Sequence, residues 1–151
     1  MEDLFRKYML LAIAEAEKAA RLDEVPIGAV IVDRDGTVLA CAHNRVVSNA
    51  DPTAHAEVLA IRDAAAAVDN YRLLNTTLYV TVEPCPMCTG AMVHARVDRL
   101  VYGAADPRWG AAGSLYQLAA DSRLNHRIDV VGGVCADECR QLMQAFFRNR
   151  R

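Results

Sequence analysis

Four residues of this sequence have side chains and spacings that could bind a metal ion and move protons. His55 and Glu57 stand two positions apart. Cys85 follows thirty positions after the histidine, and Cys88 comes three positions after Cys85. Catalytic zinc takes three protein ligands and keeps a fourth position open, whereas structural zinc usually takes four ligands. One histidine and two cysteines therefore predict one catalytic zinc ion per chain.

Glu57 is the predicted proton carrier of this site. It lies two residues beyond His55 near the start of an expected helix, so it points away from the ligand side and can reach the open position. Zinc lowers the pKa of bound water toward about 7, and a nearby carboxylate can then take a proton and pass it to a substrate. Hydrolytic deamination needs this division of roles.

Other interpretations of the same residues are weaker. A Cys-x-x-Cys pair can be a redox dithiol or half of a structural zinc site, but the histidine and glutamate ahead of it disfavour both. The other cysteines are expected to be buried core residues, namely Cys41, Cys135 and Cys139. The other histidines are expected to be hydrogen-bonded structural groups, namely His43, His94 and His126.

The elements that must position these residues begin with a helix and a hairpin. Apolar residues at helical spacing predict a first helix of roughly twenty residues, ended by Val25-Pro26. Residues 27–32 and 37–42 are rich in strand-forming residues, and Asp35-Gly36 between them supplies turn residues. Two antiparallel strands are expected.

The rest of the chain alternates between helices and strands. Asp51 and Thr53 offer capping groups ahead of the second helix, while Pro84 and Pro86 suit a first turn of the third. His55 and the cysteine pair would then lie at two helix N-termini, which carry partial positive charge that favours thiolates. Parallel strand-to-helix connections would bring these N-termini to one sheet edge. The expected elements are helices over 54–68 and 85–95, strands over 78–82, 99–103 and 127–131, a short helix within 110–118, and a C-terminal helix with an apolar face over 139–147.

Composition places these elements in one domain. A chain of 151 residues with 53% hydrophobic residues can close a single core, so residues 1–151 are expected to form one layered α/β domain with helices on both sheet faces. The apolar run over 9–14 is too short for a signal segment or a membrane span. A cytoplasmic protein without membrane association or disulfides is expected.

Charge is distributed unevenly along the chain. Residues 1–71 hold twelve acidic and seven basic side chains, whereas residues 72–151 hold seven acidic and ten basic ones, all arginine. Arg148, Arg150 and Arg151 close the chain. They could attract a polyanion, or they could be solvated cations that the dipole of a C-terminal helix favours.

Several stretches of the sequence resemble bacterial tRNA-specific adenosine deaminases, a family within the cytidine and deoxycytidylate deaminase superfamily. The H-x-E and P-C-x-x-C pattern is typical of zinc deaminases in general. The likeness runs over nearly the whole chain and is strongest in residues 24–29, 51–57, 78–85, 110–115, 125–127 and 146–148. The segment Pro107-Arg108-Trp109 departs from the family pattern.

The resemblance implies both an architecture and a reaction. The fold would be a three-layer α/β/α cytidine deaminase-like fold with a central mixed sheet of about five strands, in a homodimer with one zinc ion per subunit. The reaction would be hydrolysis of the wobble adenosine of a tRNA anticodon to inosine, with release of ammonia. The resemblance also implies substrate contacts from Asn44, Asp106, Phe147 and Arg148.

Two other functions remain open at this point. An enzyme of the same fold could deaminate a free base or nucleoside, such as guanine, cytosine or cytidine. The stretch over 110–115 and the arginine-rich tail favour tRNA, because a small-molecule enzyme has no evident use for them. A non-catalytic RNA-binding subunit would be expected to lack the proton-carrying glutamate, but Glu57 is present.

Overall fold

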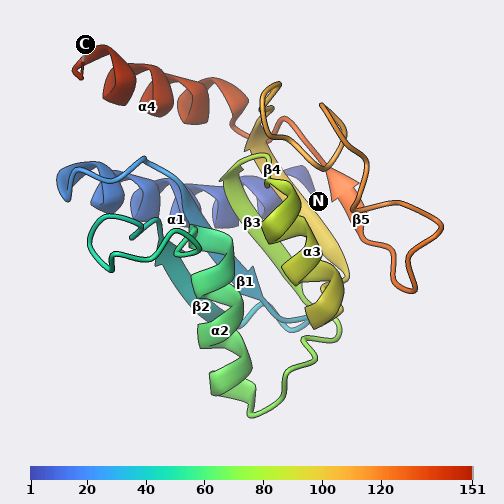
Figure 1. The fold of residues 1–151 in the computed structure, drawn as a ribbon. Helices are drawn as coiled ribbons and strands as arrows, with labels where there is room; N and C mark the ends of the chain where they lie inside the picture. Colours follow the sequence, from blue (N-terminus) through green and yellow to red (C-terminus); the bar gives the residue numbers. More distant parts are fainter. Residues whose placement is uncertain (151) are drawn as a thin grey trace.

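A five-stranded mixed sheet lies between two layers of helices in the computed structural model, which describes residues 1–150 (Figure 1). Arg151 lies outside the described residues. The elements, in chain order, are α1 (Glu2–Arg21), β1 (Gly28–Val32), β2 (Val38–His43), α2 (Ala56–Val68), β3 (Thr77–Val82), α3 (Pro86–Ala95), β4 (Arg99–Ala104), β5 (Asp129–Val131) and α4 (Ala136–Arg148).

The strand order explains where the helices begin. The order across the sheet is β2-β1-β3-β4-β5, with β1 antiparallel to both of its neighbours and β3, β4 and β5 mutually parallel. Because β1 is antiparallel to both β2 and β3, those two strands run in the same direction. The helices that follow them, α2 and α3, therefore start at the same edge of the sheet, which is the upper edge in Figure 1.

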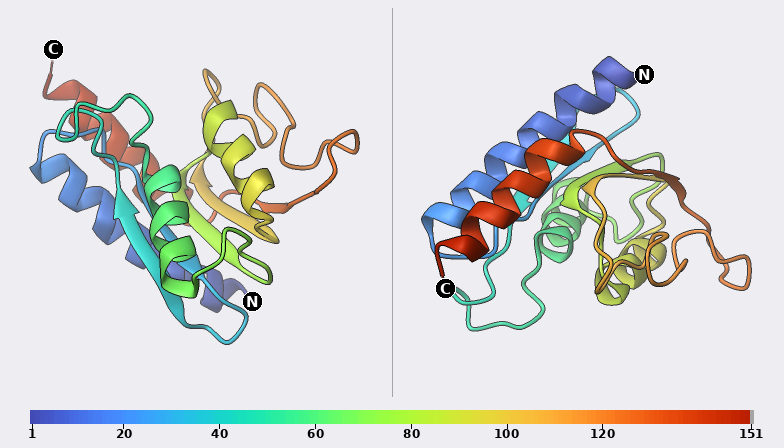
Figure 2. Two further views of the ribbon diagram at one scale, coloured as in Figure 1. Left: turned by 60° about the horizontal axis from the view of Figure 1, so that its bottom comes forward. Right: turned by 90° about the horizontal axis from the view of Figure 1, so that it is seen from above.

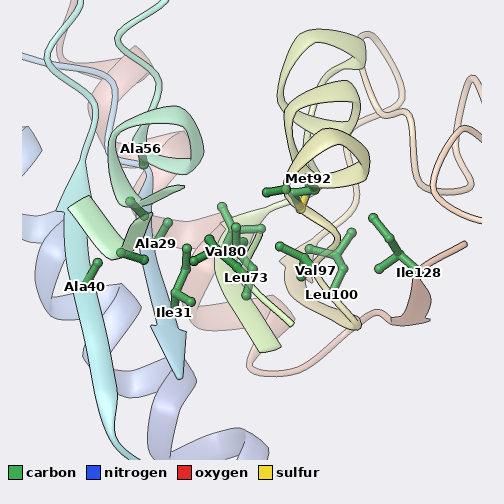
Figure 3. Close-up of a cluster of buried hydrophobic side chains, with 14 of the residues drawn as sticks. Ala29, Ile31, Ala40, Ala56, Leu73, Val80, Met92, Val97, Leu100 and Ile128 are labelled. Atoms are coloured by element: carbon green, nitrogen blue, oxygen red, sulfur yellow. The ribbon is translucent and has the colours of Figure 1, made fainter. Parts of the chain in front are cut away.

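Helices cover both faces of the sheet, so the expected α/β/α layering is confirmed. Helices α1 and α4 lie on one face and α2 and α3 on the other (Figure 2). On the second face, Ala56, Ala60 and Ala64 are four residues apart and completely buried, so they form one small-residue stripe. This stripe lets α2 lie close to the strands in the core shown in Figure 3, where Met92 of α3 also packs.

Most predicted elements are present, but the expected short helix within 110–118 and the expected burial of Cys41 were wrong. Residues 110–118 form turns and an isolated bridge between Ala112 and Gln117 instead of a short helix. The amides of Ala112 and Ser114 in this loop donate to the carboxylate of Glu83 and not to helical carbonyls. Cys41 is exposed rather than buried. Its neighbours Ala40 and Ala42 face α2, so alternation along the edge strand β2 points Cys41 to the opposite face.

The other single cysteines and histidines follow the expectation more closely. Cys139 is buried between α4 and the sheet, and Cys135 is half-buried against the same core. The ring of His43 is hydrogen-bonded to the carbonyl of Asn44 at 3.0 Å, and that of His126 to the carbonyl of Val97 at 2.7 Å. The expectation was wrong for His94, which is exposed on α3 and whose ring makes no hydrogen bond within residues 1–150.

Candidate metal centre and active site

The predicted metal ligands lie at the N-termini of α2 and α3. His55 and Cys85 are the N-cap residues of these helices, and both have extended backbone angles (φ −74°, ψ 150° and φ −76°, ψ 173°). Pro86 opens α3, where its missing N–H is not needed. Cys88 follows inside the first turn and is completely buried. The expectation that these two helix starts meet at one sheet edge is therefore confirmed.

The distances between these side chains fit a tetrahedral metal ion. Nδ1 of His55 lies 3.6 Å from Sγ of Cys85 and 3.4 Å from Sγ of Cys88, and the three atoms all lie within 4.8 Å of one another. Zinc bonds of about 2.3 Å to sulfur and about 2.0 Å to nitrogen place tetrahedral N and S ligands roughly 3.5 Å apart. The three residues can therefore hold such an ion with Nδ1 as the histidine ligand.

The electrostatics of the cluster favour a thiolate at Cys85. A hydrogen bond from the Cys88 thiol lowers the pKa of Cys85 to about 4, against the opposing effect of burial and with further help from His55. The same hydrogen bond, together with burial, raises the pKa of Cys88. The hydrogen bond to Cys85 raises the pKa of His55, although burial lowers it. The thiolate is the form in which cysteine binds metals.

Glu57 lies beside the ligand cluster without belonging to it. Only 4% of its surface is exposed, and burial raises the pKa of its carboxyl group to about 7. The charge of Cys85 acts in the same direction, whereas His55 and a hydrogen bond from Cys88 oppose it. A carboxyl group with a pKa near neutrality can both accept and donate a proton, as general acid–base chemistry requires.

Asn44 is joined to the same helix start. The backbone N–H of Ala56, the first residue of α2, donates to Oδ1 of Asn44 at 2.8 Å. The predicted capping by Asp51 and Thr53 is wrong, because Oδ1 of Asp51 instead accepts hydrogen bonds from the amide and hydroxyl of Thr53. Since Oδ1 of the buried Asn44 is occupied, its amide NH2 group is the part left to donate to another partner.

Two buried carboxylates that the sequence analysis missed hold the loops on either side of the metal ligands. Glu24 is 2% exposed and accepts hydrogen bonds from the amides of Val47 and Ser48 at 3.1 and 2.6 Å, and from the Ser48 hydroxyl. Glu83 is 3% exposed and binds the loop after β4 in the same way. For Glu83 the available signal was an acidic residue directly after a mostly apolar strand, whereas Glu24 stands beside Asp23 and gave no such signal.

The structure separates the other predicted substrate contacts into two regions. Asp106 follows β4, near the helix start that carries the cysteines, and its Oδ1 accepts hydrogen bonds from the amides of Arg108 and Trp109 at 3.0 and 3.3 Å. Phe147 and Arg148 are exposed at the end of α4, on the opposite face of the sheet from α2 and α3 (Figure 2). Only Asn44 and Asp106 therefore lie near the ligand cluster.

A three-layer fold with a His/Cys/Cys cluster and an adjacent buried glutamate defines a deaminase of the cytidine deaminase-like fold. Residues 3–151 match the family described as MafB19-like deaminase. The tRNA-specific adenosine deaminase of Haemophilus influenzae is 48% identical over 96% of this chain and 84% of its own length. The chain therefore belongs to the family of tRNA-specific adenosine deaminases.

Solved structures agree with this family and with the wider fold. A tRNA:A34 deaminase, studied for A-to-I editing at the wobble position, superposes with a TM-score of 0.86 at 44% identity, covering 90% of this chain and 98% of that one. A guanine deaminase from Bacillus subtilis has a TM-score of 0.64 at 39% identity, covering 72% of this chain and 69% of that one.

Within residues 1–150, the helices are too short or too polar to cross a membrane.

Proposed function

We propose that this chain hydrolyses the wobble adenosine of a tRNA anticodon to inosine and releases ammonia, with one zinc ion per subunit. The observation that carries the proposal is the complete set of His55, Cys85, Cys88 and Glu57, gathered at one sheet edge in a chain 48% identical to a tRNA-specific adenosine deaminase. A single deaminase domain over residues 1–151, acting in the cytoplasm where tRNA is found, completes the proposal.

The metal site supplies the nucleophile in this reaction. His55, Cys85 and Cys88 would hold the zinc, which when bound lowers the pKa of water so that it can attack near neutral pH. Glu57 takes a proton from the attacking water as the new C6–O bond forms, and gives a proton to a ring nitrogen. It then takes the second proton from the C6 hydroxyl, so that the C6 carbonyl forms, and gives it to the amine as the C6–N bond breaks, and the products are inosine and ammonia.

The remaining contacts would hold the RNA. A single-stranded loop presents bases that unstack readily, which suits a site entered by one flipped nucleotide. Asn44 is proposed to contact that nucleotide, because its Oδ1 accepts from Ala56 and its NH2 group donates to none of residues 1–150. Asp106, Phe147 and Arg148 are proposed as contacts to the flanking anticodon stem-loop.

A homodimer forms part of the proposal. Large apolar side chains are exposed in the segment after β4, at Leu115, Tyr116 and Leu124. A second copy of the chain would cover such a surface and widen a cleft that one small domain offers to an anticodon loop. Light scattering is expected to give the dimer mass at micromolar concentration, and a monomer mass during active turnover would contradict it.

A substrate competition tests the reaction itself. The zinc-loaded protein is offered an anticodon stem-loop with adenosine at the wobble position together with free adenosine, guanine and cytidine. Mass spectrometry is expected to find oxygen in place of nitrogen only in the stem-loop. A matched stem-loop with the adenosine moved one position controls for site selection. Conversion of guanine or cytidine with the stem-loop unchanged would favour a small-molecule deaminase of the same fold.

A further inference from the structure

We propose that Glu83 is a positioning residue that fixes the loop over residues 105–116 as one wall of the RNA entrance. This inference rests on the proposed function and concerns substrate binding rather than the chemical step. Glu83 directly follows β3, the strand that leads into the metal-binding helix, and the 105–116 loop follows the neighbouring strand β4. The C-terminal ends of both strands lie at the upper edge of the sheet in Figure 1.

The carboxylate of Glu83 is saturated by donors from this loop. Its Oε1 accepts hydrogen bonds from the amide of Asp106 at 3.0 Å and from the Ser114 hydroxyl. Its Oε2 accepts from the amides of Ala112 and Ser114 at 3.1 and 3.0 Å. An ionised carboxylate is a pure acceptor with room for about four donors. One buried side chain therefore ties together both ends of the loop.

The loop backbone also packs directly on this carboxylate. A Cβ atom added at Gly110 would lie 2.4 Å from Cδ and from Oε2 of Glu83, and 2.5 Å from the carbonyl oxygen of Asp106. Only glycine fits at such a close approach. The amide of Gly110 donates to that same carbonyl at 2.8 Å. The turn over residues 106–110 therefore holds the loop backbone against the carboxylate.

The same attachment reaches the metal site. The residue after Glu83, Pro84, accepts a hydrogen bond from the amide of Ala111 at 2.8 Å, and Cys85 follows at once. The loop backbone is therefore held at two consecutive residues that lead into a metal ligand. The side chain of Trp109 in this loop is 65% exposed, so one aromatic group available for stacking on an RNA base is fixed relative to Cys85.

Replacement of Glu83 by Gln tests this role in the zinc-loaded protein. Glutamine keeps the size of the side chain but turns an NH2 group toward backbone N–H donors, which leaves some of them unpaired. We expect full zinc content and faster hydrogen exchange in residues 105–116. KM for the stem-loop should rise about tenfold while kcat stays within about twofold.

A carboxylate at the other end of the sheet provides the matched control. Asp33 accepts hydrogen bonds from the amides of Asp35 and Thr37, both at 2.9 Å, in the turn between β1 and β2. This turn lies at the lower edge of the sheet in Figure 1, away from the metal ligands. Asp33→Asn should loosen its own turn and leave both kinetic constants unchanged.

A milder variant covers the case in which the Glu83→Gln protein does not fold. Ser114→Ala removes one donor and keeps the three amides on the carboxylate, so KM should rise about twofold to threefold in the same direction. If either folded variant exchanges faster in residues 105–116 but binds and deaminates the stem-loop like the parent, the role in RNA positioning is wrong. Zinc loss matching the loss of turnover would likewise overturn it.

The two proposals fail in distinguishable ways. A parent protein that does not convert the stem-loop refutes the proposed function. In that case fluorescence anisotropy with labelled stem-loop still decides the role of Glu83. Weaker binding by the Glu83→Gln protein than by the parent and the Asp33→Asn control supports it, and equal binding by all three overturns it.

Discussion

The metal site and the C-terminal segment over residues 146–150 hold their functional groups in different ways. Cys88 and Glu57 are buried at helix starts that the sheet holds together. Phe147 and Arg148, in contrast, are exposed at the free end of α4. Groups that must act on one atom of a substrate are preorganised by burial. Groups that bind a large polyanion can be exposed, but exposed groups can also pair with other side chains of the protein.

Arg150 illustrates this freedom. Its guanidinium group pairs with the carboxylate of Asp23 and lies 3.7 Å from the centre of the Phe146 ring. One positive charge of the basic tail is therefore already paired within the protein before any RNA binds. Substitutions at the metal site should accordingly have far larger effects on turnover than substitutions in the tail.

The largest effect is expected for Cys88→Ala. This change removes one of three ligands from a site whose sulfur and nitrogen atoms are already at metal-binding distances. Metal affinity and turnover should both be lost, because a two-ligand site cannot hold a catalytic zinc ion. Inductively coupled plasma mass spectrometry measures the zinc content of the purified variant.

An exposed cysteine outside the cluster gives the matched control for this experiment. Cys41→Ala should retain one zinc ion per chain and the activity of the parent. A Cys88→Ala protein that still carries a full zinc ion would remove Cys88 from the ligand set and leave the deamination mechanism without its metal site.

The second largest effect is expected for Glu57→Ala. The glutamate lies outside the candidate ligand cluster, so the variant should keep its zinc and its fold, while turnover falls by about a hundredfold to ten-thousandfold with the loss of proton transfer. Single-turnover assays on the stem-loop measure the rate, with zinc content measured in parallel. A rate within a few fold of the parent would mean that another group carries the proton.

The clustering of the candidate ligands could be predicted from the sequence because much of its geometry is local. A spacing of three at a helix start puts Cys85 and Cys88 on one side, and β3 leads directly into that turn. The layered fold could be predicted for the same reason, since runs of strand-forming residues, with turn residues between the first two, mark most of its strands. His55 required one further inference, that successive strand-to-helix connections meet at one sheet edge.

The loops could not be predicted in this way because their partners are distant in sequence. Glu24 and Glu83 bind amides 23 to 31 positions further along the chain. The amides of Ala112 and Ser114 are used by Glu83, which explains why residues 110–118 do not form the expected helix. Asn44 likewise caps α2 from twelve positions away. Such contacts follow from the packed fold and not from local periodicity.

The smallest effect is expected for truncation after Phe147, which removes Arg148 and Arg150 together with the last residue. Turnover at saturating stem-loop should change little, whereas KM should rise a few fold at low salt. Each lost phosphate contact should flatten the plot of log affinity against log salt by about 0.7 for a single strand. Fluorescence anisotropy with labelled stem-loop at two salt concentrations measures this slope.

Single substitutions separate the two arginines, because the structure gives them different surroundings. Arg148 is exposed, so Arg148→Ala should account for most of the change in salt dependence. Arg150→Ala should mainly lower the free energy of unfolding, by up to about 1 kcal/mol, because an exposed ion pair contributes no more than that. Asp23→Asn should cause a similar loss of unfolding free energy, because it breaks the same ion pair. It leaves Arg150 able to contact phosphate, so the affinity of this variant for the stem-loop should equal or exceed that of the parent. If truncated and full-length proteins bind the stem-loop equally at both salt concentrations, the arginines are solvated helix-end cations and the tail has no part in RNA binding.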